Sequence, residues 1–268
     1  MKETGIIFNS DMVRATLSGE KTQTRRIMKI QPPKRENFPG SLFGLCRAVH
    51  PDSKMFSLNQ YDRLPKHPTD WDLDGSVGVA RNAGFPMTYR CPFGQVGDRL
   101  WVRETWSLLG NEDACTIDWN DNLVKGGGVD AARIYRASCE QKPGDYGLWS
   151  IPDDADWKPH TDDMKFEGAW TPSIHMPRWA SRIILEITDV RVERLNDISE
   201  QDCWAEGIDE IDGRFENVEI IDMAVKLGCC IEDAKPMFAL LWQSIYGAEN
   251  WSANPWVWAV NFKRIEGV

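Results

Sequence analysis

The chain has 268 residues, which is long enough to bury a substantial hydrophobic core in one large domain. Its formal net charge of −10 at pH 7 argues against a long, sequence-independent contact with duplex phosphates, since such a contact needs many clustered lysines and arginines. This charge still allows a small nucleoside pocket or a local basic patch. No apolar run approaches 18 residues, so we expect no membrane-spanning segment.

The seven cysteines are scattered, and no pair has the C-x-x-C spacing of a metal or redox motif. The chain starts with a short polar stretch that leads directly into a strand-like run. We therefore expect reduced thiols, a cytoplasmic location, no metal and no cofactor. The 13 tryptophans are a high number, and we expect most of them in the core, with two or three able to stack on a base.

The first predicted elements are a short strand at residues 5–8 and a helix at 11–17. Asn9 or Ser10 can cap this helix, and an apolar face recurs along it with helical spacing. Gly19 then predicts the helix end, because glycine accepts a left-handed backbone without a Cβ penalty.

A strand with polar side chains on both faces follows Gly19. A solvated strand needs only one polar face, so two polar faces beside a tight turn indicate a functional site. One face carries Lys21, Gln23 and Arg25, and the other carries Thr22, Thr24 and Arg26.

The spacing Gly19-x-Lys21-Thr22-x-Thr24-x-Arg26 resembles the signature of the ASCH domain, a small β-barrel of the PUA-like superfamily. The surrounding chain is similar to larger ASCH-type proteins of tailed phages and prophages. The resemblance covers about the first 30 residues, residues 91–106 and most of 170–265. It implies an α+β fold, with a PUA-like (ASCH) β-barrel and flanking helices in a single domain over 1–268.

Two loop-rich insertions are predicted within this domain, at about residues 31–90 and 107–170. Prolines and glycines punctuate the first, which can hold short strands at 77–80 and 87–90. The second can hold a strand at 133–137. We interpret both as decorations of the barrel.

A turn at Gly97 leads into a predicted strand at 100–105, with Leu100 and Val102 on one face. Glu104 and Trp106 lie at its end, where the mouth of a barrel is expected. A substrate contact and a salt bridge with Arg25, Arg26 or Arg103 are alternative roles for Glu104.

Two prolines shape a predicted loop at 170–182, which precedes a strand at 183–192. The loop carries His175, Arg178 and Trp179, and histidine can act as an acid, a base or a donor near neutral pH. A purely structural histidine is the alternative.

A short helix is predicted between Ser199 and Glu206, with a capping box formed by Ser199 and Asp202 and an end at Gly207. A glutamate at a helix C-terminus is disfavoured by the helix dipole, so Glu206 needs another reason to be there. The rest of the chain predicts helices at 217–227 and 234–246, a loop at 247–251 and a closing strand at 254–263.

The resemblance extends to bacterial N4-acetylcytidine amidohydrolases, whose proposed catalytic set is a lysine, a threonine three residues later and a distant glutamate. Lys21, Thr24 and Glu206 match it, as base, nucleophile and acid/base. The implied activity is hydrolysis of an N-acylated, cytidine-like nucleoside. The residues predicted to bind the substrate are Arg25, Arg26, Glu104, Trp106, His175, Arg178 and Trp179.

A non-catalytic module that binds RNA or a modified nucleotide is the alternative hypothesis. Arg25 and Arg26 would then contact phosphate, and Trp106 or Trp179 would stack on a base. The expected partner is a nucleoside or a single-stranded nucleic acid, with no membrane partner. A metal-free ribonuclease, using lysine and histidine, is a third variant.

Overall fold

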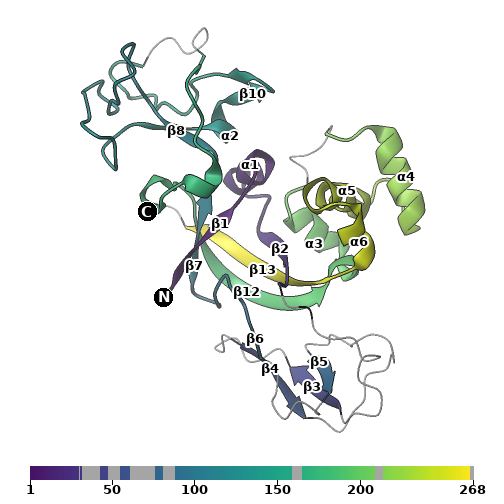
Figure 1. Ribbon diagram of the computed structural model, residues 1–268. Coiled ribbons are helices and arrows are strands. Elements are labelled where there is room, and N and C mark those ends of the chain that lie inside the picture. The colour runs from purple at the N-terminus through teal and green to yellow at the C-terminus, as the bar shows by residue number, and fades with distance from the viewer. Residues whose placement is uncertain are drawn as a thin grey trace. The chain divides into compact units, whose positions relative to one another are not determined.

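A computed structural model describes residues 1–29, 31, 91–158, 165–208 and 214–265, together with the backbone of four strands between residues 43 and 90. The described parts mix helices and strands, which confirms the predicted α+β class (Figure 1). The helices are α1 (Ser10–Ser18), α2 (Arg136–Cys139), α3 (Glu200–Ala205), α4 (Asn217–Leu227), α5 (Ala234–Tyr246) and α6 (Ala248–Ala253), with 3₁₀ turns at Ser173–His175, Arg178–Ala180 and Leu195–Asp197.

A five-stranded mixed sheet has the strand order β1-β7-β12-β13-β2 (Figure 1). The edge strand β2 pairs antiparallel with β13, and Thr24 lies opposite Val260. The five strands are β1 (Glu3–Ile7), β2 (Gln23–Ile27), β7 (Arg99–Arg103), β12 (Ile184–Arg194) and β13 (Trp256–Ile265).

The remaining strands form smaller antiparallel sheets. One has four strands in the order β5-β3-β4-β6, and two have two strands each. The short strands predicted near 77–80 and 87–90 correspond to β5 and β6, whereas the other residues of 32–87 outside β3, β4 and β5 lie beyond the described part. The strands are β3 (Phe43–Arg47), β4 (Met55–Gln60), β5 (Ser76–Ala80), β6 (Thr88–Arg90), β8 (Trp106–Leu108), β9 (Arg133–Tyr135), β10 (Glu140–Lys142) and β11 (Asp145–Tyr146).

The chain divides into two compact units, each built from separate stretches of sequence. The first unit comprises residues 1–3, 19–99 and 186–263, and the second comprises 4–18, 100–185 and 264–268. Each unit is described by itself below. The single domain expected from the sequence stays a prediction.

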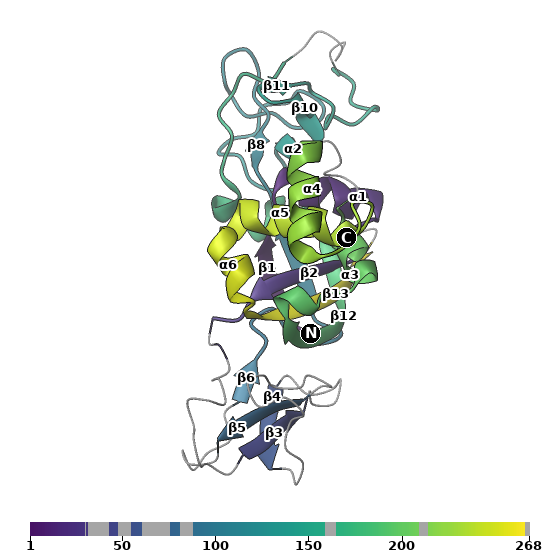
Figure 2. The ribbon, with the colours of Figure 1, turned by 90° about the vertical axis from the view of Figure 1, so that its right-hand side faces the viewer.

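In the first unit, α5 packs against α3, α4 and α6, which lie near it in the chain (Figure 2). Phe238 and Trp242 of α5 are buried in a shared core with Trp251 of α6 and Cys203 of α3. Burial of large aromatic side chains is the main stabilising contribution here, because apolar area removed from water dominates folding free energy.

In the second unit, residues 107–170 build a hydrophobic core of their own. Ile134 and Cys139 are fully buried, and Trp170 packs against the cluster with its ring centroid 4.7 Å from that of Phe166. This stretch, predicted to be a loop-rich decoration, therefore contributes packed structure as well as loops.

The helices predicted at 217–227 and 234–246 are confirmed as α4 and α5. The loop predicted at 247–251 is wrong, because these residues belong mostly to α6. Gly247 has a positive φ of 89°, which ends α5 and lets a new helix start at once. Burial of Trp251 then stabilises this short helix, an effect of tertiary packing that local sequence does not reveal.

Within the described residues, no helix combines the length and the apolar character needed to cross a membrane.

Gly19 connects α1 to β2 with a φ of +91°, as the sequence predicted for a helix stop. We expect Gly19→Ala to lower the free energy of unfolding by about 1 kcal/mol, because a Cβ is strained in this backbone region even where the space is open. Urea unfolding followed by tryptophan fluorescence would measure the loss. Gly19→Asn is the control, since asparagine tolerates positive φ better, and an equal loss in both variants would contradict the backbone explanation.

Candidate functional site

Lys21 lies just before β2, and two hydrogen bonds fix the backbone of the next residue, Thr22. The Thr22 amide donates to the Ala205 carbonyl (2.9 Å), and the Phe262 amide donates to the Thr22 carbonyl (2.8 Å). The Lys21 side chain is fully buried, and its Nζ lies 2.8 Å from Glu206 Oε2 and 2.8 Å from the Glu206 backbone oxygen. A single residue thus supplies both acceptors.

Burial lowers the pKa of the Lys21 ammonium group from its ordinary value of 10.5, because a low-dielectric environment disfavours the charged form. The Glu206 carboxylate opposes this effect, and the nearby charges of Arg26 and Arg25 reinforce it. The net result is a lowered pKa, so the ammonium group of Lys21 gives up its proton more readily than that of an ordinary lysine.

Glu206 caps the C-terminus of α3, and Gly207 follows it with a φ of +78°. The predicted end of the helix is therefore confirmed. At the other end, Ser199 Oγ accepts a hydrogen bond from the Asp202 amide (3.1 Å), the first half of the predicted capping box. The ammonium group of Lys21 offsets the unfavourable position of a buried carboxylate at a helix C-terminus.

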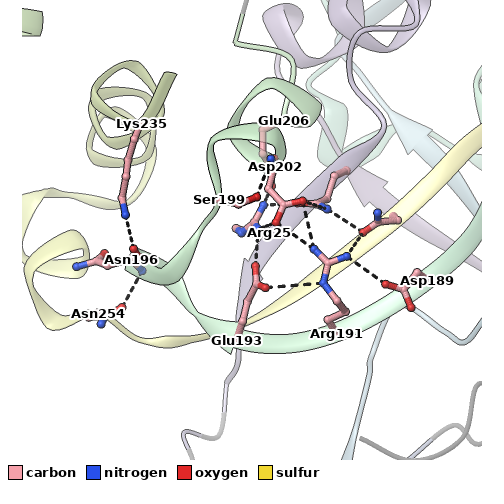
Figure 3. A network of polar contacts seen from close by, with 12 residues as sticks. Arg25, Asp189, Arg191, Glu193, Asn196, Ser199, Asp202, Glu206, Lys235 and Asn254 are labelled. Carbon is pink, nitrogen blue, oxygen red and sulfur yellow. Dashed lines mark hydrogen bonds and ion pairs between the residues drawn. The ribbon is translucent and has the colours of Figure 1, made fainter. Parts of the chain in front are cut away.

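The guanidinium group of Arg25 is also fully buried, within reach of several oxygen atoms (Figure 3). Its Nη1 lies 3.2 Å from Glu206 Oε1 and also donates to Gln23 Oε1. Its Nη2 lies 3.0 Å from Asp202 Oδ2 and also pairs with Glu193. Burial lowers the pKa of Arg25, but the three carboxylates outweigh it and raise the pKa, so this group stays charged.

Asp202 also contacts polar groups other than Arg25. Arg191 Nη2 lies 3.2 Å from Asp202 Oδ2, and Gln23 Nε2 donates to Asp202 Oδ1 at 3.0 Å (Figure 3). Asn261 Oδ1 accepts from Gln23 Nε2 at 2.9 Å and from Arg191 Nη1 at 3.3 Å. The network therefore links β2, α3, β12 and β13 within the first unit.

Thr24 leaves β2 on the face opposite to Gln23 and Arg25, because side chains alternate along a strand. It is fully buried, and its Oγ1 has no hydrogen-bond partner among the described residues. The structure therefore brings Lys21 and Glu206 into contact but forms no hydrogen bond between Lys21 and Thr24. A buried hydroxyl without a partner is unusual and is a feature found at catalytic positions.

Arg26 shares the Thr24 face of the strand by the same alternation. It is partly exposed, and its Nη1 donates to the hydroxyl of Tyr246 in α5 at 3.2 Å. Arg26 is thus held by contacts outside the Arg25 network.

A buried thiol also lies on α3. Burial raises the pKa of Cys203 to about 12, so this group is protonated near neutral pH. Since the thiolate is the nucleophilic form, Cys203 is a poor nucleophile.

The other predicted site residues belong to the second unit. Glu104 is buried and accepts two hydrogen bonds from Arg182, at 2.9 Å from Nε and 3.0 Å from Nη2. The Arg182 guanidinium lies 4.0 Å from the ring centroid of Tyr135, whose hydroxyl donates to the Ala180 carbonyl at 2.9 Å. A salt bridge, the alternative role predicted for Glu104, is thus present, but its partner is Arg182 in place of the predicted Arg25, Arg26 or Arg103.

Trp106 and Trp179 meet edge to face, with ring centroids 5.5 Å apart. Trp106 is buried, whereas Trp179 is partly exposed and its backbone carbonyl accepts from Arg133 Nη1 at 2.8 Å. His175 is exposed at the end of a 3₁₀ turn, and Arg178 begins the next 3₁₀ turn. The loop predicted at 170–182 is therefore a pair of short turns.

The predicted site residues are divided between the two units, five in each. The polar partners that surround Arg25 and Glu104 were not predicted from the sequence. The available signals were the shared strand face of Gln23 and Arg25 and the capping position of Asp202. The missed residues are Gln23, Arg182, Arg191, Glu193, Asp202 and Asn261.

Among the residues that the structure describes, no three histidine, cysteine, aspartate or glutamate side chains are grouped so that they could hold a metal ion.

Comparisons of the chain with protein-family models, with curated proteins and with solved structures found no match.

Removal of the Glu104 carboxylate should destabilise the protein, because it leaves the Arg182 guanidinium without its ion-pair partner. We expect Glu104→Ala to lower the free energy of unfolding by about 3 kcal/mol, as for other buried pairs that lose one member. Glu140→Ala is the matched control in the same unit, since it breaks the more exposed pair with Arg136 (2.9 Å) and should cost less than about 1 kcal/mol. Equal losses in urea unfolding would show that the Glu104 pair has no special role.

The network also predicts a loss of stability in acid. Burial raises the pKa of the Asp202 carboxyl, but the Gln23 hydrogen bond and the charges of Arg25 and Arg191 outweigh it, so the pKa lies below the ordinary 3.8. Asp202 therefore contributes stability above the unfolded-state pKa, and this is lost as the pH falls through the lower folded-state pKa. Urea midpoints between pH 6 and pH 2.5 should fall less steeply in Asp202→Asn than in the wild type.

The control for this experiment is Asp222→Asn, which removes an exposed carboxylate on α4. Its acid dependence should match that of the wild type. If Asp202→Asn keeps the full acid dependence, the network does not hold Asp202 in its charged form.

Proposed function

We propose that the protein is a nucleoside-directed amidohydrolase of ASCH type, acting on an N-acylated, cytidine-like substrate. The resemblance at Gly19–Arg26 supports the reaction class and a PUA-like barrel as the fold. The observation that carries the proposal is the buried contact between Lys21 Nζ and Glu206 Oε2, at 2.8 Å.

Amide hydrolysis requires a base, a nucleophile and a group that stabilises the developing oxyanion. The lowered pKa of Lys21 makes its neutral form, which a general base needs, more accessible than in an ordinary lysine. Glu206 holds this amine in place and can pass the proton on to the departing amino group.

The proposed reaction requires the Thr24 hydroxyl, which makes no hydrogen bond with Lys21 in this structure, to come within reach of Lys21 when substrate binds. Lys21 then takes the proton of the hydroxyl while Oγ1 attacks the acyl carbonyl. Collapse of the tetrahedral intermediate breaks the carbon–nitrogen bond, and the amine leaves with a proton delivered through Glu206. Water then hydrolyses the acyl ester on Thr24, which releases the carboxylic acid and restores the hydroxyl.

Two further features support these roles. Thr24 Oγ1 has no hydrogen-bond partner among the described residues, so no neighbouring group competes for its lone pairs or its proton. Arg26 leaves the strand on the same face as Thr24, where its positive charge suits stabilisation of an oxyanion formed at the attacked carbonyl.

A phosphate-binding module is less well supported. Such a module needs cationic groups that face the ligand, but the Arg25 guanidinium is buried against three carboxylates. Stacking of a base on Trp106 would likewise require an exposed ring face, and this residue is only 6% exposed, which leaves the partly exposed Trp179 as the ring for such a role.

The test is a hydrolysis assay of the purified protein with N4-acetylcytidine and related N-acylated nucleosides. We expect Lys21→Ala, Glu206→Ala and Thr24→Val each to lower kcat by about a hundredfold or more, since each removes a group that acts on the reacting atoms. Lys235→Ala is the matched lysine control, because Lys235 Nζ donates to the backbone oxygen of Asn196 at 2.6 Å and belongs to α5, outside the Lys21–Glu206 contact.

Two outcomes would contradict parts of the proposal. No turnover by the folded wild-type protein on any N-acylated nucleoside would reject the amidohydrolase and favour the nucleotide-binding module. Full turnover by Thr24→Val, with loss in the Lys21 variant, would mean that water and not Thr24 attacks the carbonyl.

A further inference from the structure

The carboxylate of Glu206 is shared between two buried cations. Oε2 lies 2.8 Å from Lys21 Nζ, and Oε1 lies 3.2 Å from Arg25 Nη1. A carboxylate held at both oxygens cannot rotate about its terminal torsion without breaking one of these contacts. The orientation of Glu206 toward Lys21 is therefore set from its other side.

Arg25 is itself held on its far side. Its Nη2 contacts Glu193 of β12 and Asp202 of α3, and its Nη1 also donates to Gln23 on its own strand. The planar guanidinium group suits this arrangement, since it presents several donors in a fixed fork that a lysine cannot reproduce. Figure 3 shows the resulting convergence of the three elements on Arg25.

Basic and acidic side chains pair throughout this cluster. Lys21, Arg25 and Arg191 pair with four carboxylates, which are Asp189, Glu193, Asp202 and Glu206. Buried ions are tolerated only when such pairing offsets the cost of desolvation. An Arg25 that left this cluster to bind a ligand would uncover three buried or half-buried carboxylates.

We infer that Arg25 is a positioning residue that occupies one oxygen of the Glu206 carboxylate and so leaves only the other oxygen to Lys21. This inference rests on the proposed function and gives Arg25 a different role from the substrate contact predicted from the sequence. Arg25 acts through Glu206, and its charge also opposes protonation of Lys21, a direction that agrees with its effect on the Lys21 pKa.

The charged groups that face Lys21 determine how its pKa should change when Arg25 is substituted. Glu206 of α3 raises the pKa of Lys21, whereas Arg25 and Arg26 of β2 lower it, in addition to burial. Removal of Arg25 takes away one lowering charge and leaves both oxygens of Glu206 free to pair with Lys21. The pKa of Lys21 should therefore rise toward its ordinary value of 10.5.

The test is an NMR titration of the full chain with ¹³C-labelled lysine, in which the Lys21 signal is assigned by its loss in Lys21→Arg. We expect an upward shift of the Lys21 pKa in Arg25→Gln. Arg191→Gln is the matched control, because Arg191 belongs to the same network but pairs with Asp189, Glu193 and Asp202 and not with Glu206. Its Lys21 pKa should equal that of the wild type.

Arg25→Lys serves as the second variant if Arg25→Gln does not fold. It keeps a positive charge, but one ammonium group cannot contact all four partners at once, so the Lys21 pKa should again rise. With N4-acetylcytidine, kcat of Arg25→Lys should fall at least about tenfold with little change in KM, because misplaced catalytic groups slow chemistry more than binding.

An unchanged or lower Lys21 pKa in whichever of these Arg25 variants folds would overturn the inference. So would an equal upward shift in Arg191→Gln, which would indicate a general loosening of the network. The titration needs no substrate. If the hydrolysis assay rejects the amidohydrolase proposal, the titration still tests the effect of Arg25 on Lys21 by itself.

Discussion

The buried ion pair between Lys21 and Glu206 is the interaction on which the candidate site depends. Removing two charges from water costs several kcal/mol per ion, and the attraction between them offsets this cost only with good geometry and further hydrogen bonds. Here the pair has both, since Nζ reaches two oxygens of Glu206 at 2.8 Å and the carboxylate has a second cation, Arg25. The surrounding polar side chains complete this compensation, which explains why so many of them gather at one edge of the sheet.

The alternation of β2 divides its polar residues between two tasks. Gln23 and Arg25 point into the ion-pair network, while Thr24 and Arg26 leave on the opposite face. Lys21 precedes the strand, and its long side chain reaches the network from there. A short strand can thus contribute both the electrostatic support of a site and the groups proposed to meet the substrate, because consecutive residues face opposite ways.

Local signals predicted much of this structure. Helical spacing located α4 and α5, Ser199 and Gly207 marked the ends of α3, and Gly19 marked the end of α1. These features depend on residues a few positions apart. Burial of Leu100 and Val102 on one face of β7 also followed the predicted alternation.

Contacts between distant residues were not predictable in the same way. Arg25 lies 168 residues from Glu193, and Glu104 lies 78 residues from Arg182, so only the folded arrangement identifies these partners. Lys21 and Glu206 were connected through the family resemblance, not through any local pattern. The helix α6 was missed because burial of Trp251 stabilises a segment too short to be helical by itself.

The backbone carbonyl and the carboxylate of Glu206 both accept a hydrogen bond from Lys21 Nζ. This double contact constrains how the chain can change in evolution. Each residue in an α-helix turns the side chains that follow by about 100°. One residue inserted in or deleted from α3 would leave a carbonyl at the helix end for Lys21 to contact, but would rotate the carboxylate away from it. The distance from Ser199 to Gly207 should therefore stay constant in functional descendants of this protein, even where the loops nearby gain or lose residues.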